Sequence, residues 1–125
     1  MKPRDAALRL KQFEAAEKAR KVAAMETMVL DLEQVAADLA RQIAAEEERT
    51  GIKDPAHFAY STFAKAAAQR RANLLTSVAD LRAKLARARR DHEEAVLDLG
   101  KLEPSEIHDG ERELGKPDSN GLMMG

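Results

Sequence analysis

The sequence predicts an all-α fold, a two-helix antiparallel coiled-coil hairpin over residues 1–102 that is followed by a disordered acidic tail over residues 103–125. Three observations support this prediction. Glycine and proline, the strongest helix breakers, leave two long stretches of the chain uninterrupted. Both stretches repeat apolar residues every 3.5 positions. Their charges are arranged in blocks of opposite sign, which favours a chain that folds back on itself.

The first helix is expected over about 4–50, because neither glycine nor proline occurs between Pro3 and Gly51. Proline suits the first turn of a helix, and glycine suits the left-handed residue just beyond its end. Heptad position a holds Leu8, Ala15, Val22, Val29, Ala36 and Ile43, and position d holds Lys11, Lys18, Met25, Leu32 and Leu39. These positions share one face of the helix, which is expected to form a buried seam.

The turn is expected over residues 51–55, and the second helix over about 56–102. Asp54 can cap that helix and Pro55 can take its first position, although Ser61 offers another cap that would leave a short turn before the main helix. Position a holds Ala64, Arg71, Val78, Leu85, His92 and Leu99, and position d holds Tyr60, Ala67, Leu74, Leu81, Ala88, Ala95 and Leu102. Such a stripe is typical of a buried seam without chemistry.

The charge blocks indicate how the two helices pair. Residues 1–22 carry seven basic and three acidic side chains, and residues 23–50 carry two basic and seven acidic ones. Residues 61–90 carry eight basic and one acidic side chain, and residues 91–125 carry three basic and ten acidic ones. Folding back at the turn places opposite charges alongside each other, whereas a parallel pairing would place like charges together. The hairpin is therefore expected to be antiparallel and to form within one chain.

The composition argues against an enzyme with a broad core. Alanine accounts for 24 of the residues, and the chain has three Phe, one Tyr and no Trp. The absence of cysteine excludes disulfides and thiolate metal sites. Apolar runs are too short to span a bilayer, and no signal-peptide pattern opens the chain, so we expect a cytoplasmic protein without direct membrane insertion.

The histidines also predict no chemistry. His57, His92 and His108 are too scattered along the chain to form a metal cluster. His92-Glu93-Glu94 begins like a zincin motif, but Val96 stands where the second histidine would be, so His92 is interpreted as a polar seam residue. We therefore expect no catalytic, metal-binding or cofactor-binding residue, and no cofactor.

Two groups of side chains are candidates for binding. A basic cluster could meet nucleic acid or an acidic protein, or could pair with the first helix; it comprises Arg82, Lys84, Arg87, Arg89 and Arg90. No aromatic residue is interleaved with it for base stacking, so no nucleic-acid partner is expected. Phe58, Tyr60 and Phe63 follow the turn and either cap the end of the hairpin or expose an anchor for another protein. In the heptad frame Tyr60 enters the seam and Phe63 falls at g, on its border.

The stretch TGIKDPAHFAYSTFAK at residues 50–65 and the opening LRLKQF at residues 8–13 resemble the flagellar export protein FliJ family, in its short alphaproteobacterial form. The resemblance covers roughly residues 4–102. It implies a non-enzymatic coiled-coil stalk or adaptor of the flagellar type III export apparatus, peripheral to the inner membrane at the flagellar base. The alternatives are an unrelated small coiled-coil scaffold and a nucleic-acid-binding helical hairpin.

The resemblance also implies partners. Family members insert the end that carries both chain termini into the hexameric export ATPase, so the basic residues Lys2, Arg4, Arg9 and Lys11 are expected to face the ring. They contact the export-gate membrane protein through a surface that includes the Phe of an aromatic-x-x-Phe pattern, here Tyr60 and Phe63. One and two turns further on, the corresponding positions are Ala67 and Arg70, where this sequence departs toward smaller or charged side chains. Export chaperones are a further class of expected partner.

Overall fold

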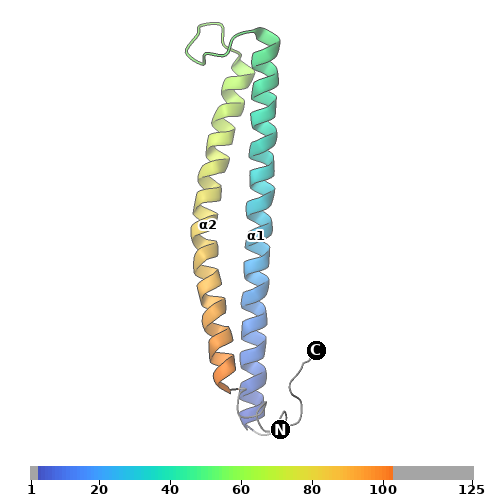
Figure 1. The fold of residues 1–125 in the computed structure, drawn as a ribbon, viewed down its shortest axis with the longest axis vertical. Coiled ribbons are helices and arrows are strands. Elements are labelled where there is room, and N and C mark those ends of the chain that lie inside the picture. The colour runs from blue at the N-terminus through green and yellow to red at the C-terminus, as the bar shows by residue number, and fades with distance from the viewer. Residues whose placement is uncertain (1–2, 103–125) are drawn as a thin grey trace, which may run out of the picture. The chain divides into compact units, whose positions relative to one another are not determined.

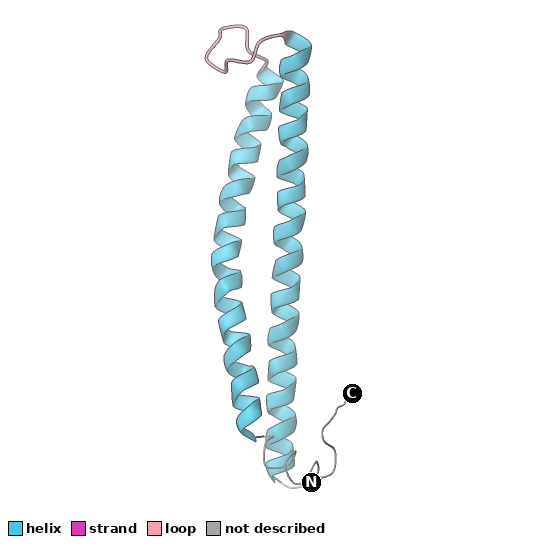
Figure 2. Cartoon of the chain, viewed as in Figure 1, coloured by secondary structure: helices cyan, strands magenta, loops and turns pink. Residues whose placement is uncertain are grey.

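A computed structural model describes residues 3–102 of the chain. It contains helix α1, Pro3–Thr50, and helix α2, Thr62–Leu102, joined by a loop over residues 51–61 (Figure 1). Within the described range the chain forms helices and this loop but no strand (Figure 2). The predicted all-α helical hairpin is confirmed. The predicted tail at residues 103–125 lies outside the described residues.

Two compact units make up the described chain. The loop unit comprises residues 21–88, in which α1 runs up to the loop and α2 runs back beside it. The terminal unit includes residues 3–20 of α1 and residues 89–102 of α2, which also lie side by side (Figure 1). Each unit therefore pairs a segment of α1 with a segment of α2, as expected for a chain that doubles back on itself.

The end of α1 is fixed by Gly51. Its φ of 75° lies in the left-handed region, which glycine adopts without the steric penalty that a Cβ atom brings. The Gly51 N–H donates a 2.9 Å hydrogen bond to the Glu47 carbonyl oxygen, and the Ile52 N–H donates to Thr50 Oγ1 at 3.2 Å. These bonds satisfy backbone groups that the end of a helix would otherwise leave without partners. The helix ends where the sequence placed the break.

The start of α2 differs from the expected position. We expected a helix from about residue 56, but α2 begins at Thr62. The Ala64 N–H donates to Ser61 Oγ at 3.1 Å, so Ser61 acts as the N-cap. Asp54 instead holds a local turn, in which its Oδ1 accepts from the Ala56 N–H at 2.9 Å and its carbonyl oxygen accepts from the His57 N–H at 3.0 Å. The predicted cap at Asp54 therefore starts a turn rather than a helix.

The predicted seam is confirmed by burial. Every a and d position of α2 from Ala64 to Leu99 is buried or half-buried, and every other position of α2 is exposed. In α1, Lys11 and Lys18 are exposed at d, because long charged side chains extend into solvent at the edge of the seam. The buried side chains of the described residues are Ala15, Val29, Ala36, Leu39, Ala64, Ala67, Val78, Leu85 and Ala88.

Ion pairs of two kinds accompany the seam. Arg82 of α2 pairs with Glu33 of α1, which joins a basic and an acidic block across the loop unit as the charge pattern predicted. Several other pairs join residues three apart on one helix, including Arg20 with Glu17 at 2.7 Å and Lys11 with Glu14 at 3.7 Å. Exposed pairs of this spacing contribute only a few tenths of a kcal/mol each.

Candidate functional site

Phe63 is the second residue of α2 and has 54% of its surface exposed. Its place in the frame explains this exposure, because Ala64 and Ala67 point into the seam while position g borders it. An aromatic side chain exposed to this extent at the start of an ordered helix is a candidate contact for another protein.

Tyr60 does not share this exposure. It is half-buried, and its hydroxyl donates a 2.6 Å hydrogen bond to Glu47 Oε2 near the end of α1. This hydrogen bond to the carboxylate, together with burial and the Glu47 charge, raises the pKa of Tyr60. Tyr60 therefore fastens the loop to α1, as expected if it caps the end of the hairpin, and its role as a partner contact stays a prediction.

Glu46 joins the end of α1 to Ser61, the N-cap of α2. Its Oε2 accepts from Ser61 Oγ at 2.6 Å and from Arg49 Nη2 at 2.8 Å, and its Oε1 accepts from Arg49 Nε at 3.0 Å. The hydrogen bonds from Arg49 and Ser61 lower the pKa of Glu46 from 4.5 to about 2. The carboxylate thus holds the N-cap of α2, on which the position of Phe63 depends.

The loop presents a second aromatic side chain. Phe58 is 96% exposed, and its ring stacks on His57 with centroids 4.8 Å apart and an interplanar angle of 22°. His57 Nδ1 accepts a 3.0 Å hydrogen bond from the Ala59 N–H, and the Tyr60 N–H donates to the His57 carbonyl oxygen at 3.0 Å. The loop is therefore internally bonded around His57, while Phe58 extends into solvent.

The other two predicted gate contacts, Ala67 and Arg70, differ in their exposure to solvent. Ala67 is buried, with 7% of its surface exposed, because it occupies position d of the seam. The assignment of Ala67 to the partner surface rests on the resemblance alone, and its burial leaves little of the side chain for a partner to touch. Arg70 is exposed at position g, one heptad beyond Phe63. Of the four predicted gate residues, Phe63 and Arg70 remain available on the surface.

The predicted ring contacts lie in the terminal unit. Arg4, Arg9 and Lys11 are exposed on α1, and Lys11 pairs with Glu14. Lys2 lies outside the described residues. Leu10 and Phe13, which were not singled out from the sequence, are exposed by 56% and 59% on the same stretch. The signal that could have found them is their place at c and f, outside the seam.

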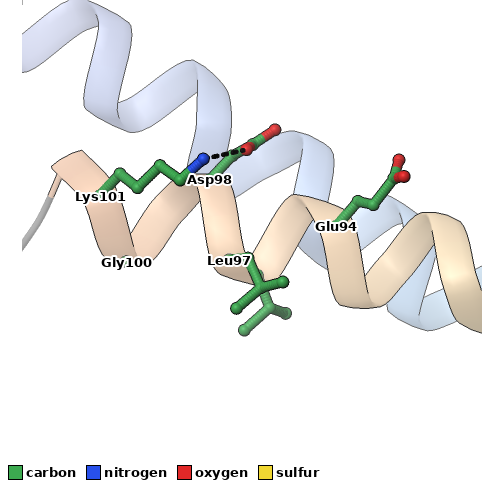
Figure 3. A pocket seen from close by; sticks show the side chains of 6 residues that line it. Glu94, Leu97, Asp98, Gly100 and Lys101 are labelled. Carbon is green, nitrogen blue, oxygen red and sulfur yellow. Dashed lines mark ion pairs between the residues drawn. The ribbon is translucent and has the colours of Figure 1, made fainter.

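A surface pocket lies on the last turns of α2 (Figure 3). Lys101 Nζ and Asp98 Oδ1 form an ion pair at 3.9 Å, drawn as the dashed line in Figure 3. Leu97 points away from the neighbouring helix in the same view and is 67% exposed. The described lining residues are Glu94, Val96, Leu97, Asp98, Gly100 and Lys101. They offer carboxylates, one ammonium group and apolar side chains.

Two further findings concern residues 3–102. In this range no three His, Asp or Glu side chains gather closely enough to hold a metal ion. Over the same residues neither helix has a stretch apolar enough to cross a membrane.

We compared the chain with protein-family models, with curated proteins and with solved structures, and none of them matches it.

Proposed function

We propose that this chain is a non-enzymatic adaptor of the flagellar type III export apparatus, which binds the export ATPase ring through its termini-bearing end and the export-gate membrane protein through the surface at Phe63. The resemblance of residues 50–65 to the FliJ family motivates the identity of the apparatus. The observation that carries a binding role is the 54% exposure of Phe63 on a helix start that is bonded to α1.

The hydrogen bonds that hold the start of α2 should increase the affinity for the gate protein. A side chain that is already ordered before binding loses less conformational entropy when a partner covers it. Ser61 both caps α2 and bonds Glu46, and Tyr60 bonds Glu47, so two hydrogen bonds to α1 hold the backbone that carries Phe63. Phe63 can therefore act as an aromatic anchor for a pocket on the gate protein.

The terminal unit supports the proposed ring contact. Arg9 and Lys11 bring positive charge to α1, and Leu10 and Phe13 add exposed apolar surface beside them. Interfaces commonly combine an apolar centre with charged surroundings. In this proposal the protein is cytoplasmic, lies at the inner membrane beneath the flagellum and also meets export chaperones.

Isothermal titration of the chain against the cytoplasmic domain of the export-gate protein tests the gate contact. Phe63→Ala should weaken binding by about 30-fold, or about 2 kcal/mol, because it removes an anchor of hot-spot size. The matched control is Leu75→Ala, which removes an apolar side chain that is 39% exposed on the other border of the seam.

The proposed gate contact requires binding that Phe63→Ala weakens and Leu75→Ala leaves within twofold of the wild type. Equal affinities for the two variants, at unchanged helicity by circular dichroism, would remove Phe63 from the contact. Absence of binding by the wild type to both the gate domain and the export ATPase would refute the adaptor function itself.

A further inference from the structure

The two borders of the seam differ in charge within the loop unit. We define the g flank as Lys21, Met28, Val35, Gln42, Arg49, Phe63, Arg70, Ser77 and Lys84, and the e flank as Glu26, Glu33, Ala40, Glu47, Ala68, Leu75 and Arg82. In an antiparallel pair, e positions of one helix face e positions of the other, and g positions face g positions. The Arg82–Glu33 ion pair joins two e positions and confirms this arrangement.

The g flank carries four basic side chains and no acidic one, whereas the e flank carries three acidic side chains and one basic one. Arg70 and Lys84 are exposed, and among residues 3–102 neither has a carboxylate partner. Arg49 differs from them, because Glu46 already binds its guanidinium group at 2.8 Å. The g flank therefore has a positive charge that the described part of the chain leaves uncompensated.

Apolar surface lies on the same flank. Phe63 is 54% exposed and Met28 is 49% exposed, and the half-buried Val35 stands between them along the seam border. Phe63, Arg70, Ser77 and Lys84 follow one another at intervals of seven residues. Three heptads of helix extend about 32 Å at 1.5 Å per residue. The g flank is thus a stripe that carries both basic and apolar side chains.

We propose that the g flank binds an acidic amphipathic helix of a partner protein, which packs along the border of α1 and α2 as the third helix of a coiled coil. The inference deepens the proposed function, on which it rests for the role of Phe63 as a partner contact. Apolar side chains of the incoming helix would cover Phe63, Val35 and Met28. Its carboxylates would meet Arg70 and Lys84.

Charge complementarity selects this occupant over two others. A second copy related by a twofold axis would place one g flank on another, so that basic side chains would meet basic side chains. Nucleic acid would require a dense row of cations, but apolar residues interrupt the g flank and the whole chain has a formal net charge of −1. An acidic helix with one apolar face satisfies both features of the stripe.

The test uses a synthetic 21-residue probe, a helical peptide with leucine at a and d and glutamate at the flanking positions, labelled for fluorescence anisotropy. A second peptide replaces the glutamates by glutamine. We expect the glutamate peptide to bind the full chain at least tenfold more tightly at low salt. The double variant Arg70→Glu with Lys84→Glu should reverse this preference.

Lys65→Glu provides the matched control, because Lys65 is an exposed cation on the same helix at position b, away from the g flank. It changes the net charge by the same amount as Arg70→Glu or Lys84→Glu alone. It should leave the affinity for the glutamate peptide within twofold of the wild type. Phe63→Ala should weaken the binding of both peptides. Circular dichroism on each variant verifies that helicity is retained.

Three outcomes would overturn the inference: equal binding of the two peptides, an equal loss for Lys65→Glu and for the double variant, or tighter binding of a 20-base-pair DNA duplex. An apparent molar mass from light scattering that rises with protein concentration would also overturn it, because the g flank would then pair with the e flank of a second copy. Binding of the glutamate peptide by a chain that binds neither the export-gate domain nor the export ATPase would refute the proposed function and leave this inference intact.

Discussion

Glu46 shows how one carboxylate can connect the fold to the candidate surface. It accepts hydrogen bonds from Arg49, three residues further along α1, and from Ser61, which caps α2. Both partners favour its ionised form, and the resulting pKa of about 2 lies below the ordinary 4.5. A group whose pKa is depressed in the folded state stabilises that state above its unfolded pKa. This contribution is lost as the pH falls from about 4.5 to about 2.

We therefore expect Glu46→Gln to reduce the acid sensitivity of the hairpin. The variant should be less stable than the wild type at pH 7, and the difference should shrink as the pH falls from 4.5 toward 2. Thermal unfolding followed by circular dichroism at several pH values measures this. Glu48→Gln is the control, because the Glu48 side chain is 82% exposed and its ion pair with Lys53 is long, at 3.7 Å. A constant difference between wild type and Glu46→Gln at all pH values would contradict the role of the carboxylate.

At the scale of elements, the two glycines of the described chain have opposite roles. Gly51 ends α1 with a positive φ, whereas Gly100 lies within α2. No atom lies within 4 Å of a Cβ added at either position, so space does not distinguish them. Backbone conformation does, because an L-residue in the left-handed region is strained while alanine favours a helix over glycine.

Gly51→Ala should accordingly lower the free energy of unfolding by about 1 kcal/mol, and Gly100→Ala should raise it by about 0.5 kcal/mol. Chemical denaturation at neutral pH measures both. Effects of the same sign in the two variants would show that the left-handed conformation at Gly51 is not what ends α1.

The elements also show which features can be predicted from sequence. The break at Gly51 and the seam positions follow from local signals, a helix breaker and a heptad repeat, and the structure bears both out. The start of α2 could not be decided locally, because Asp54 and Ser61 both suit an N-cap. Ser61 is favoured in the structure by its additional bond to Glu46, which lies 15 residues away. That tertiary contact leaves residues 56–61 in the loop.

The candidate site was only partly predictable for a related reason. The frame placed Phe63 at the border of the seam, and the structure finds it exposed. Ala67 was assigned by resemblance to the same surface, although its d position already indicated burial. Met28 and Val35 join Phe63 on the g flank only because α1 and α2 are paired in one register. A single helix pattern cannot reveal such a shared border.

At the scale of the whole molecule, the core is thin. Of the nine buried residues within the described range 3–102, five are alanine, and the larger ones are Val29, Leu39, Val78 and Leu85. Alanine allows the helices to approach closely but buries little apolar area, at roughly 25 cal/mol per Å². The stability of such a fold rises markedly when a partner binds the native state. Binding stabilises the folded state in proportion to the logarithm of the partner concentration. A hairpin built in this way is expected to be most ordered when a partner is bound.

Site-specific photo-crosslinking shows whether a partner contacts the g flank. A photoreactive residue would replace Ser77, in the middle of the g flank, or Ala79, which is also exposed on α2 but lies at position b. With the export-gate cytoplasmic domain present, we expect a strong crosslink from position 77 and a weak one from position 79. A crosslink of equal strength from both positions, or one from position 79 alone, would contradict it.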